Sequence, residues 1–418
     1  MNRKIFSILA FLTVLFALPV KAQVQLSDSA KISMLTASEW NGAVYALFGH
    51  TALRVSDDST GVNAVYNYGF FDSSQPNFIY NFVLGRTDYI LGFTTFEDFL
   101  FEYEYRGQEV VEQELNLSAE EKRQLYDALY INALPQNRGY RYNYFYDNCA
   151  TRPRDMVEKF TDGKIKYQPA SQNQSFRDLV HESLEKYPWL KFGIDLIIGS
   201  DADVTIGVRE KMFIPAYLKN SFEEALILKN DTSDYPLVKN TKILLYNNNE
   251  INKISEEILY SPIVVAFAIL FLTISVSLIQ ITKLNITKIP KIYDTAIFGI
   301  AGLGGLVLSV TIFFSEHPAT SPNWNFVWLN IFALAAAILF WAKSANRTVY
   351  IYHFINFALL TVFLLLWLFI PQHLPVATIP FSMSLWFRSG THLFMRRKKI
   401  LKDKRFSSSR ELKAGWGL

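Results

Sequence analysis

Cysteine is nearly absent from this chain of 418 residues, which contains only Cys149. A lone thiol has no partner in the same chain, so no intramolecular disulfide can form. The sequence also has no glycine-rich phosphate loop, no paired-cysteine metal site and no helical histidine pair spaced for zinc. We therefore expect no metal and no cofactor, and any chemistry must come from the side chains themselves.

The net charge is also small, at +3. Much of the positive excess lies in one basic segment near the C-terminus, which begins at Arg396 and continues to Arg405. A basic tail beside an apolar segment typically orients a membrane protein or contacts anionic lipid. The charge pattern therefore does not favour nucleic-acid binding, and we expect no nucleic-acid partner.

The N-terminus resembles a secretory signal peptide. Arg3 and Lys4 precede an apolar run from Ile5 to Val20, and the residues up to Ala22 are typical of a cleavage site. We expect cleavage after Ala22, so that residues 1–22 are the signal peptide. An uncleaved N-terminal anchor is the alternative, and in both cases the chain that follows is exported.

Long apolar runs fill much of the C-terminal third. Each has close to the ~20 residues needed to cross ~30 Å of hydrocarbon. Arg388 lies in the last run, where its side chain is expected to reach the headgroups; a segment lying along the interface is the alternative. We predict an all-α five-helix membrane bundle over residues 261–395, with spans at 262–282, 293–314, 325–342, 349–370 and 374–394.

The distribution of lysine and arginine predicts the orientation of these spans. The loops 283–291 and 343–347 and the tail 396–418 are basic, whereas the loops 315–324 and 371–373 contain no lysine or arginine. Basic loops remain in the cytoplasm. We therefore expect a multi-pass protein of the inner membrane, with a periplasmic N-terminal domain and a cytoplasmic C-terminal tail.

The exported part is long enough for one domain at residues 23–228, followed by a polar connector at 229–260. Alternating and helical patterns are both present in the domain. Ser118 and Glu121 have the spacing of a capping box. The pattern predicts an α+β domain, with strands near 31–37, 50–56, 62–71 and 108–117 and helices near 76–84, 118–133, 149–160, 176–186 and 189–199.

Cys149 lies among polar, aromatic and charged residues rather than apolar ones. Asp147 and Asn148 are candidate N-caps that would place Cys149 in the first turn of a helix, with Asn148 supporting the thiol. A helix N-terminus lowers the pKa of a thiol, and this favours a reactive thiolate. Pro153 would remove an early hydrogen bond from that helix, so a start closer to Thr151 is the alternative.

His50 is the candidate base for this thiol. Histidine and cysteine that are distant in sequence can meet in space as a nucleophile–base pair. Asn67, on the next predicted strand, is a candidate to orient the imidazole ring; Asp72 and Asp88 are alternatives. The backbone N–H of Cys149 is a candidate oxyanion-hole donor. The competing interpretation makes the cysteine a small buried hydrophobe and the histidine a core residue.

Five motifs stand out along the chain: Phe48-Gly49-His50-Thr51-Ala52, Tyr66-Asn67-Tyr68-Gly69, Gly85-Arg86-Thr87-Asp88-Tyr89, Tyr144-Phe145-Tyr146-Asp147-Asn148-Cys149-Ala150-Thr151-Arg152-Pro153-Arg154-Asp155 and Phe192-Gly193-Ile194-Asp195. A histidine followed by Asn-Cys at a helix start resembles the permuted papain-like superfamily, which includes NlpC/P60 and lecithin:retinol acyltransferase-like proteins. With the five spans, the motifs resemble the Bacteroides-type lipoprotein N-acyltransferase (Lnb) family.

This resemblance implies a permuted papain-like (NlpC/P60-like) domain and a Cys–His acyltransferase. The enzyme would move an acyl chain from a phospholipid, through a thioester on Cys149, to the α-amine of the diacylglyceryl N-terminal cysteine of a lipoprotein. His50 would deprotonate that amine. Its partners would be membrane lipid, the phospholipid donor and the diacylated lipoprotein acceptor.

Two other functions fit the same residues. The first is a membrane-anchored NlpC/P60-like peptidoglycan amidase or peptidase that uses the same Cys–His pair. Five spans argue against it, because a single anchor would suffice. The second is a membrane sensor or binding protein in which the pair is not catalytic.

Overall fold

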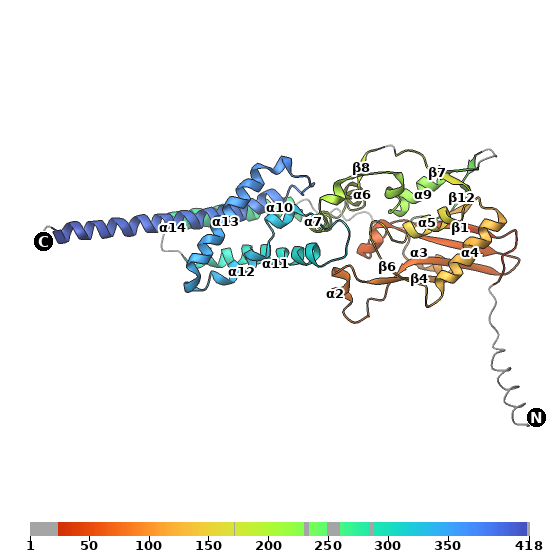
Figure 1. The fold of residues 1–418 in the computed structure, drawn as a ribbon, viewed down its shortest axis with the longest axis horizontal. Helices are drawn as coiled ribbons and strands as arrows, with labels where there is room; N and C mark the ends of the chain where they lie inside the picture. Colours follow the sequence, from red (N-terminus) through yellow and green to blue (C-terminus); the bar gives the residue numbers. More distant parts are fainter. Residues whose placement is uncertain (1–23, 171, 230–233, 249–259, 284–286, 416–418) are drawn as a thin grey trace, which may run out of the picture.

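The computed structural model describes residues 24–170, 172–229, 234–248, 260–283 and 287–415. A mixed α/β body occupies one end of the molecule, and the helices of the C-terminal region extend away from it, with α14 reaching furthest (Figure 1). The predicted signal peptide, residues 1–22, lies outside the described residues.

A seven-stranded antiparallel sheet forms the centre of the α/β body, in the order β12-β5-β1-β2-β3-β4-β6. The strands predicted near 31–37, 50–56, 62–71 and 108–117 are present, whereas β4 and β6 were not predicted. The strands are β1 (Lys31–Ala37), β2 (His50–Asp57), β3 (Val62–Phe70), β4 (Asp88–Thr95), β5 (Val110–Leu115), β6 (Gly139–Arg141) and β12 (Val238–Leu245).

Both faces of this sheet are covered by helices. Alternate residues of β1 enter different cores, with Ile32 and Met34 on one face and Leu35 and Ala37 on the other. Two-sided burial explains why β1 is apolar almost throughout.

Among the described residues, the α/β body contains seven helices and one short turn of helix. The predicted capping box at Ser118 and Glu121 is present at the start of α4. Helix α3, which is capped by Thr95, was not predicted. The helices are α2 (Phe78–Val83), α3 (Phe96–Tyr105), α4 (Ala119–Ala133), α5 (Thr151–Phe160), α6 (Phe176–Ser183), α7 (Pro188–Ile197), α8 (Val208–Lys211) and α9 (Pro215–Glu223).

The segment predicted as a polar connector, residues 229–260, is in part a strand of the sheet. Strand β12 pairs antiparallel with β5 and forms the edge of the seven-stranded sheet. Its residues are largely exposed and polar, with lysines at 239 and 242. Lysine on an edge strand discourages pairing with other molecules. Because these residues are polar, the strand lacks the hydrophobic alternation from which strands are predicted.

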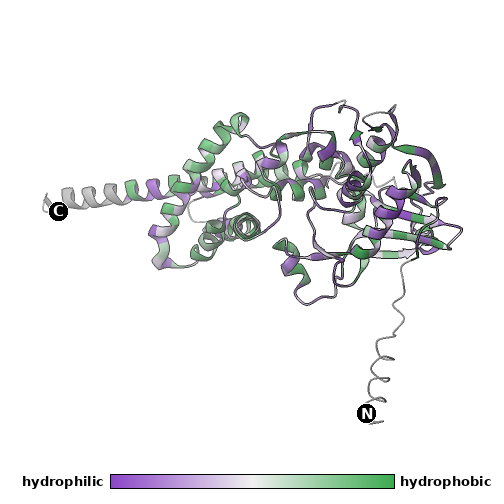
Figure 2. Ribbon diagram, turned by 45° about the vertical axis from the view of Figure 1, so that its right-hand side comes forward, coloured by the Kyte–Doolittle hydropathy of each residue, from purple (hydrophilic) through white to green (hydrophobic). Residues whose placement is uncertain are grey.

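Three helices of the described residues are long and apolar enough to cross a membrane: α10 (Pro262–Thr282), α11 (Lys288–Phe313) and α13 (Asn346–Leu365), the last extended by η6 (Lys343–Ala345). Hydrophobic residues, coloured green, predominate along the ribbon of this region (Figure 2). The third predicted span contains the shorter pieces η5 (Trp324–Val327) and α12 (Ile331–Leu339). The fifth predicted span, 374–394, lies in α14 (Thr378–Gly415) from Thr378 onward, and this helix continues into the predicted basic tail.

Arg388 does not reach the headgroups as predicted. Its side chain is 1% exposed and forms an ion pair with Asp294 of α11. It also donates hydrogen bonds to Ser277 and Gln280 of α10. Burial of a guanidinium is tolerated when its donors are paired in this way. Arg388 therefore joins three helices of the C-terminal region.

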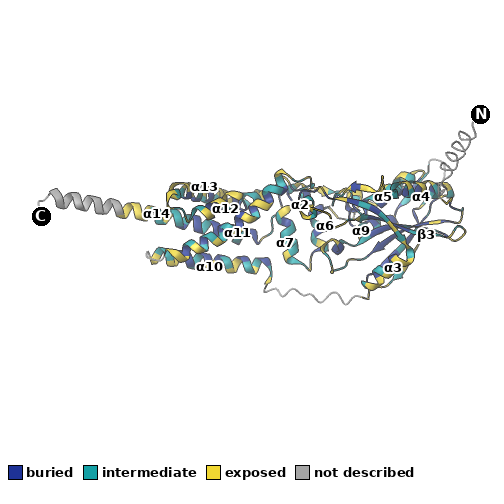
Figure 3. Cartoon of the chain, turned by 90° about the horizontal axis from the view of Figure 1, so that it is seen from below, coloured by how far each residue is buried: buried dark blue, intermediate teal, exposed yellow. Residues whose placement is uncertain are grey.

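The loop between α11 and η5 contacts the α/β body, and α7 lies between the two regions (Figure 3). Glu316 forms ion pairs with Arg86 and Arg141. The Asn323 amide donates hydrogen bonds to the carbonyl oxygens of Leu196 and Ile197, at 2.8 and 2.9 Å. The two regions are thus joined by polar contacts as well as by the chain itself.

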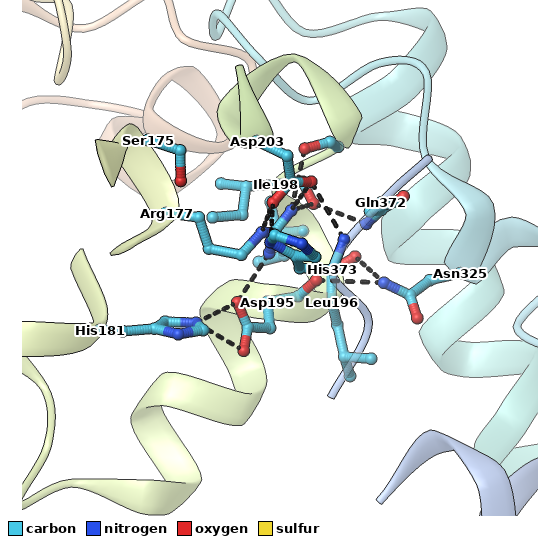
Figure 4. A network of polar contacts seen from close by, with 12 residues as sticks. Ser175, Arg177, His181, Asp195, Leu196, Ile198, Asp203, Asn325, Gln372 and His373 are labelled. Atoms are coloured by element: carbon cyan, nitrogen blue, oxygen red, sulfur yellow. Dashed lines mark hydrogen bonds and ion pairs between the residues drawn. The ribbon is translucent and has the colours of Figure 1, made fainter. Parts of the chain in front are cut away.

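A buried cluster of charged residues lies close to this junction (Figure 4). The guanidinium of Arg177 forms ion pairs with Asp195 and Asp203, both at 2.7 Å. It also donates to the carbonyl oxygens of Ile198 and Gly199. We call Arg177, Asp195 and Asp203 the Arg177 cluster. Its carboxylates contact His181 and His373, so it links α6, α7 and the loop before α14.

Candidate active site

The site is built at the end of the β2–β3 hairpin where the two strands stop pairing. The register between them extends from Asp57–Val62 to Leu53–Tyr66 and includes neither His50 nor Asn67. The side chains of these two residues nevertheless meet, with His50 Nε2 at 3.2 Å from Asn67 Oδ1. The structure therefore brings this histidine and this asparagine into contact.

Cys149 lies against both strands in this unpaired region. The backbone N–H of Thr51, the neighbour of His50 on β2, lies close enough to its sulfur to lower the pKa of the thiol. On β3, a Cβ built at Gly69 would lie 3.5 Å from the Cβ of Cys149. The fold thus brings the thiol to Thr51, which follows the histidine, and to Gly69, which is two residues from the asparagine, although these residues are distant from Cys149 in sequence.

Two glycines give the backbone its shape here. Gly69 has φ of +103° and lies where the β3–β4 register shifts, which is typical of a β-bulge. Gly49 has φ of +80°, and a Cβ on it would lie only 2.7 Å from the carbonyl oxygen of Ala37. Side chains at these positions would be strained and, at Gly49, would clash. Both glycines therefore help to position the site.

Asn148 holds the loop that carries the thiol. Its Oδ1 accepts hydrogen bonds from the N–H groups of Ala150 and Thr151, at 2.8 and 2.9 Å. Its Nδ2 donates to the carbonyl oxygens of Tyr144 and Phe213, both at 2.8 Å. Asn148 is buried, so these bonds fix the loop against the core.

Helix α5 begins at Thr151, with Ala150 as N-cap, rather than at Cys149. Asn148 is therefore not the N-cap residue, although its side chain satisfies free N–H groups at the helix start. Pro153 then occupies the third position of the helix, where a missing N–H removes no intrahelical bond. The alternative start near Thr151 is the one that the structure adopts.

The orientation of the Asn67 amide determines which nitrogen of His50 carries the proton. Asn67 Nδ2 donates to the carbonyl oxygen of Val65 and to Thr94 Oγ1, at 3.4 and 3.5 Å. Its Oδ1 therefore faces His50 as an acceptor, and Nε2 of the imidazole must be the protonated nitrogen. This leaves Nδ1 unprotonated and able to accept a proton.

The alternative orienting residues are engaged elsewhere. Asp72 is exposed and accepts hydrogen bonds from Ser74. Asp88 forms an ion pair with Arg141 on the neighbouring strand. Of the three candidates, Asn67 is the one whose side chain contacts His50.

The pKa shifts favour a neutral pair rather than the predicted thiolate. Burial raises the pKa of Cys149 to about 11, although the N–H groups of Thr51 and of Cys149 itself oppose this shift. Burial lowers the pKa of His50 to about 4; the hydrogen bond that its Nε2–H donates to Asn67 Oδ1 opposes this shift, and the positive Arg106 adds to it. Both groups keep some exposed surface, but close packing dominates their electrostatics. Without substrate, the site therefore holds a thiol and a neutral imidazole.

Tyrosines that the sequence did not single out as functional surround the thiol. Tyr103 lies nearly parallel to the His50 ring at a centroid distance of 6.4 Å, and it is near enough to Cys149 that an ionised sulfur would raise its pKa. Tyr140 and Tyr144 also interact with Cys149. The motif containing Tyr144 was visible in the sequence, but Tyr103 belongs to the unpredicted helix α3.

Several hydroxyl groups of the candidate site lack hydrogen-bond partners. Among the described residues, the buried hydroxyls of Tyr140, Tyr144 and Thr51 have no hydrogen-bond partner. Buried polar groups are usually paired, so such groups need an explanation. Together with a thiol and a proton acceptor, they give the site the composition needed for acyl transfer.

Two family models match the chain. The Lnb N-terminal periplasmic domain matches residues 20–182, and the Lnb transmembrane domain matches residues 253–400. The first match includes His50, Asn67, Asn148 and Cys149. No curated protein and no solved structure is similar enough to the chain to match it. The two domains occur in the family's order and together cover most of the chain, which therefore belongs to the Lnb family as a lipoprotein N-acyltransferase-like membrane protein.

Proposed function

We propose that the protein moves an acyl chain from a phospholipid to the α-amine of the diacylglyceryl N-terminal cysteine of a bacterial lipoprotein. Cys149 is the nucleophile, His50 the base and Asn67 the residue that orients the base. One observation carries the proposal: Cys149 lies against Thr51 and Gly69, beside the hydrogen-bonded His50–Asn67 pair, in an Lnb family member.

In the first half-reaction, the sulfur of Cys149 attacks an ester carbonyl of the phospholipid while Nδ1 of His50 removes the thiol proton. Proton removal must accompany attack, because the thiol is neutral in the resting site. The ester C–O bond then breaks. His50 returns its proton to the leaving oxygen, so that a lysophospholipid departs and a thioester remains on Cys149.

In the second half-reaction, the lipoprotein amine attacks the thioester carbonyl. An ordinary α-amine has a pKa of about 8, so it needs a base for efficient attack at neutral pH. His50 removes a proton from the attacking nitrogen, the C–S bond breaks, and the sulfur recovers its proton from His50. The products are an amide on the lipoprotein and the free enzyme.

The backbone N–H groups of Thr51 and Cys149 support this chemistry. Both lie beside the sulfur, and hydrogen-bond donors near the reacting carbonyl stabilise the negative oxygen of a tetrahedral intermediate. Thr51 extends the sequence-based proposal, which named only the N–H of Cys149. We further propose that the α/β body is a permuted papain-like catalytic domain.

The proposed topology places both substrates within reach. The C-terminal region forms five spans of the inner membrane, the catalytic domain lies in the periplasm, and the C-terminal tail is cytoplasmic. The proposal keeps residues 1–22 as signal peptide, 261–395 as membrane region and 396–418 as tail. The catalytic domain is 23–228 with β12 added. Phospholipid and diacylated lipoprotein are both anchored in the membrane, so tethering the enzyme there supplies proximity.

The test begins with the purified full-length protein and phospholipid that carries a labelled acyl chain. We expect label on Cys149 that neutral hydroxylamine releases, as it does for thioesters. Cys149→Ser should give a hydroxylamine-resistant oxygen ester or no adduct. His50→Ala should slow labelling strongly, whereas the matched control His373→Ala, at a side chain 74% exposed, should not.

The second arm is mass spectrometry of lipoprotein N-termini in cells whose only N-acyltransferase is this protein. Wild type should give the triacylated form, and Cys149→Ala the diacylated form at equal expression. Full triacylation by Cys149→Ala would sink the proposal. Digestion of purified cell wall by the wild-type protein, without lipid transfer, would support the peptidase alternative.

A further inference from the structure

A groove in the C-terminal region has no role in the chemistry above. It lies between α12 and α13, with a volume of about 660 Å³, within the ~300–1,000 Å³ typical of ligand sites. Its lining includes Trp324 at one end and Leu339 and Thr348 at the other. None of the residues that line it is charged. The groove is therefore long, apolar and large enough for part of a lipid.

The groove exists because α12 is drawn toward α11 and away from α13. Gly302 and Gly305 of α11 allow close approach: a Cβ on them would lie 2.2 Å from the backbone nitrogen of Leu334 and 2.3 Å from the carbonyl carbon of Asn330. Small residues commonly permit such contacts between membrane helices. By contrast, α12 makes few contacts with α13. The open side of α12 is the groove.

The length of α12 adds to this opening. Its nine residues extend about 14 Å at ~1.5 Å per residue, less than half of the ~30 Å hydrocarbon thickness. Residues around the groove present apolar side chains outward, as shown by Phe332, Ile355 and Leu359, which are all at least half exposed. Among membrane helices such a surface faces lipid, and the groove is continuous with it.

The mouth of the groove lies where the C-terminal region meets the α/β body. Asn323 lines the mouth and bonds to α7, while Trp324 beside it is 40% exposed. Tryptophan is enriched where hydrocarbon meets headgroups. Because the mouth carries amides and an indole but no charge, it has no feature that selects a charged headgroup.

We propose that this groove binds an acyl chain of a phospholipid and measures the length of the chain that the enzyme transfers. Phospholipid is the bulk component of the bilayer into which the groove opens, so mass action favours it over the rarer lipoprotein. This assignment rests on the proposed function for its link to transfer, although binding itself does not. The groove then sets chain preference, and the site at Cys149 performs the chemistry.

Binding is tested with full-length Cys149→Ala protein in nanodiscs made with a phosphatidylcholine that bears a photoreactive diazirine near the end of one chain. After irradiation and peptide mapping, we expect crosslinks to concentrate in segments 324–339 and 348–359. Ala335→Trp, at an exposed groove residue, should reduce these crosslinks at least fivefold. The matched control Ala358→Trp, exposed on α13 outside the lining, should not.

Crosslinks spread evenly over α10 and α11, or unchanged by Ala335→Trp, would overturn the groove assignment. Because Cys149→Ala cannot form a thioester, this result does not depend on the proposed function.

The link to transfer is tested with Cys149 intact, by competition between phospholipids with long and short chains. Ala335→Trp should shift the preference toward the shorter chain by about tenfold, and Ala358→Trp should leave it unchanged. Groove crosslinking without this shift would overturn the role in chain selection while leaving the proposed function intact. An absence of transfer by wild type would instead contradict the proposed function. The crosslinking map would still show whether the groove binds an acyl chain.

Discussion

The candidate active site and the Arg177 cluster are both buried groups of polar side chains, but they differ in how many of their polar atoms have hydrogen-bond partners. The guanidinium of Arg177 is bound to Asp195, Asp203 and two carbonyl oxygens (Figure 4). At the active site, the described structure leaves the hydroxyls of Tyr140 and Tyr144 without partners. The guanidinium of the Arg177 cluster is therefore fully paired, whereas the candidate active site has hydroxyls that can still form hydrogen bonds.

This difference is the one expected between a structural cluster and a site proposed to carry out chemistry. A fully paired cluster stabilises one arrangement of the chain, because any movement would leave a buried charge without a partner. A site that must bind a substrate needs donors and acceptors that no other part of the chain has taken. Burial of the Cys149–His50 region also keeps both groups neutral, whereas the Arg177 cluster depends on opposite charges.

The largest expected effect comes from Cys149→Ala. Acyl transfer should fall on the order of 10⁴-fold or more, because the nucleophile is lost. The free energy of unfolding should change by less than about 1 kcal/mol, since a small, partly exposed side chain is replaced by a smaller one. Enzyme assays and thermal unfolding of the purified protein measure the two quantities. Activity within tenfold of wild type would contradict the nucleophile.

Arg177→Met should show the reverse pattern. Two buried carboxylates lose their cationic partner, so the free energy of unfolding should fall by about 3–5 kcal/mol. Thermal unfolding in detergent is the measurement. Arg123→Met, which removes a solvent-exposed ion pair, is the control and should leave the free energy of unfolding almost unchanged. An Arg177→Met protein as stable as wild type would mean that the cluster is not structural.

The neutral thiol makes a prediction about pH. With the pKa of Cys149 raised to about 11, only about one molecule in 10⁴ carries the thiolate at pH 7. Maleimide labelling should therefore be about 300-fold slower at pH 7 than for an ordinary thiol of pKa ~8.5, and should rise about tenfold per pH unit from 7 to 10. The reference is Ser73→Cys in a Cys149→Ala background. A plateau below pH 8 would indicate the thiolate–imidazolium pair instead.

Asn67→Ala tests the orientation of the base. Loss of the acceptor for His50 Nε2 should lower kcat roughly 10- to 100-fold, because the imidazole is no longer held in one orientation. The hydrogen bond raises the pKa of His50, so its removal should also move the acid limb of thioester formation to lower pH. Asn67→Asp, which keeps an acceptor, should recover part of the rate.

The control for this variant is Asn63→Ala on the same strand, whose amide contacts Arg54 and Glu97 rather than His50. It should leave the pH profile of thioester formation unchanged. Equal effects of the two variants would assign Asn67 to the structure of β3.

Glu316→Gln should give the smallest effect. It removes ion pairs with Arg86 and Arg141 at the junction of the two regions, but all three side chains are about half exposed. Exposed pairs contribute about 0–1 kcal/mol, so the midpoint of thermal unfolding should change little and less still at high salt. A loss of several kcal/mol would show that the junction depends on these surface pairs.

Several elements were predictable because their signals are local. Strand β1 and helix α10 begin and end where the hydrophobic pattern predicts, and α4 begins at its capping box. Strand β12 and helix α3 were not predicted, because the exposed polarity of the first and the mixed pattern of the second resemble loops. Arg388 was predicted at the headgroups for a different reason. Its partner Asp294 is 94 residues away in sequence, so no local pattern indicates the ion pair.

At the candidate site, the residue types were enough to select Cys149, His50, Asn67 and Asn148 as candidates. They did not predict the pKa shifts of the cysteine and the histidine. The sequence favoured a helix N-terminus that would ionise the thiol, whereas in the structure burial raises its pKa. Burial is a property of everything packed around an atom, including Tyr103 from an unpredicted helix. No local pattern contains that information.

The sequence alone therefore determined the export signal expected at the N-terminus, the apolar segments, their expected orientation and the identity of the candidate reactive side chains, because each depends on residues adjacent in the chain. Only the tertiary structure decided that Cys149 meets Thr51 and Gly69, that Arg177 is saturated by two aspartates, and that α12 leaves a groove beside α13. These features depend on distance and burial in three dimensions, which arise when distant segments pack together.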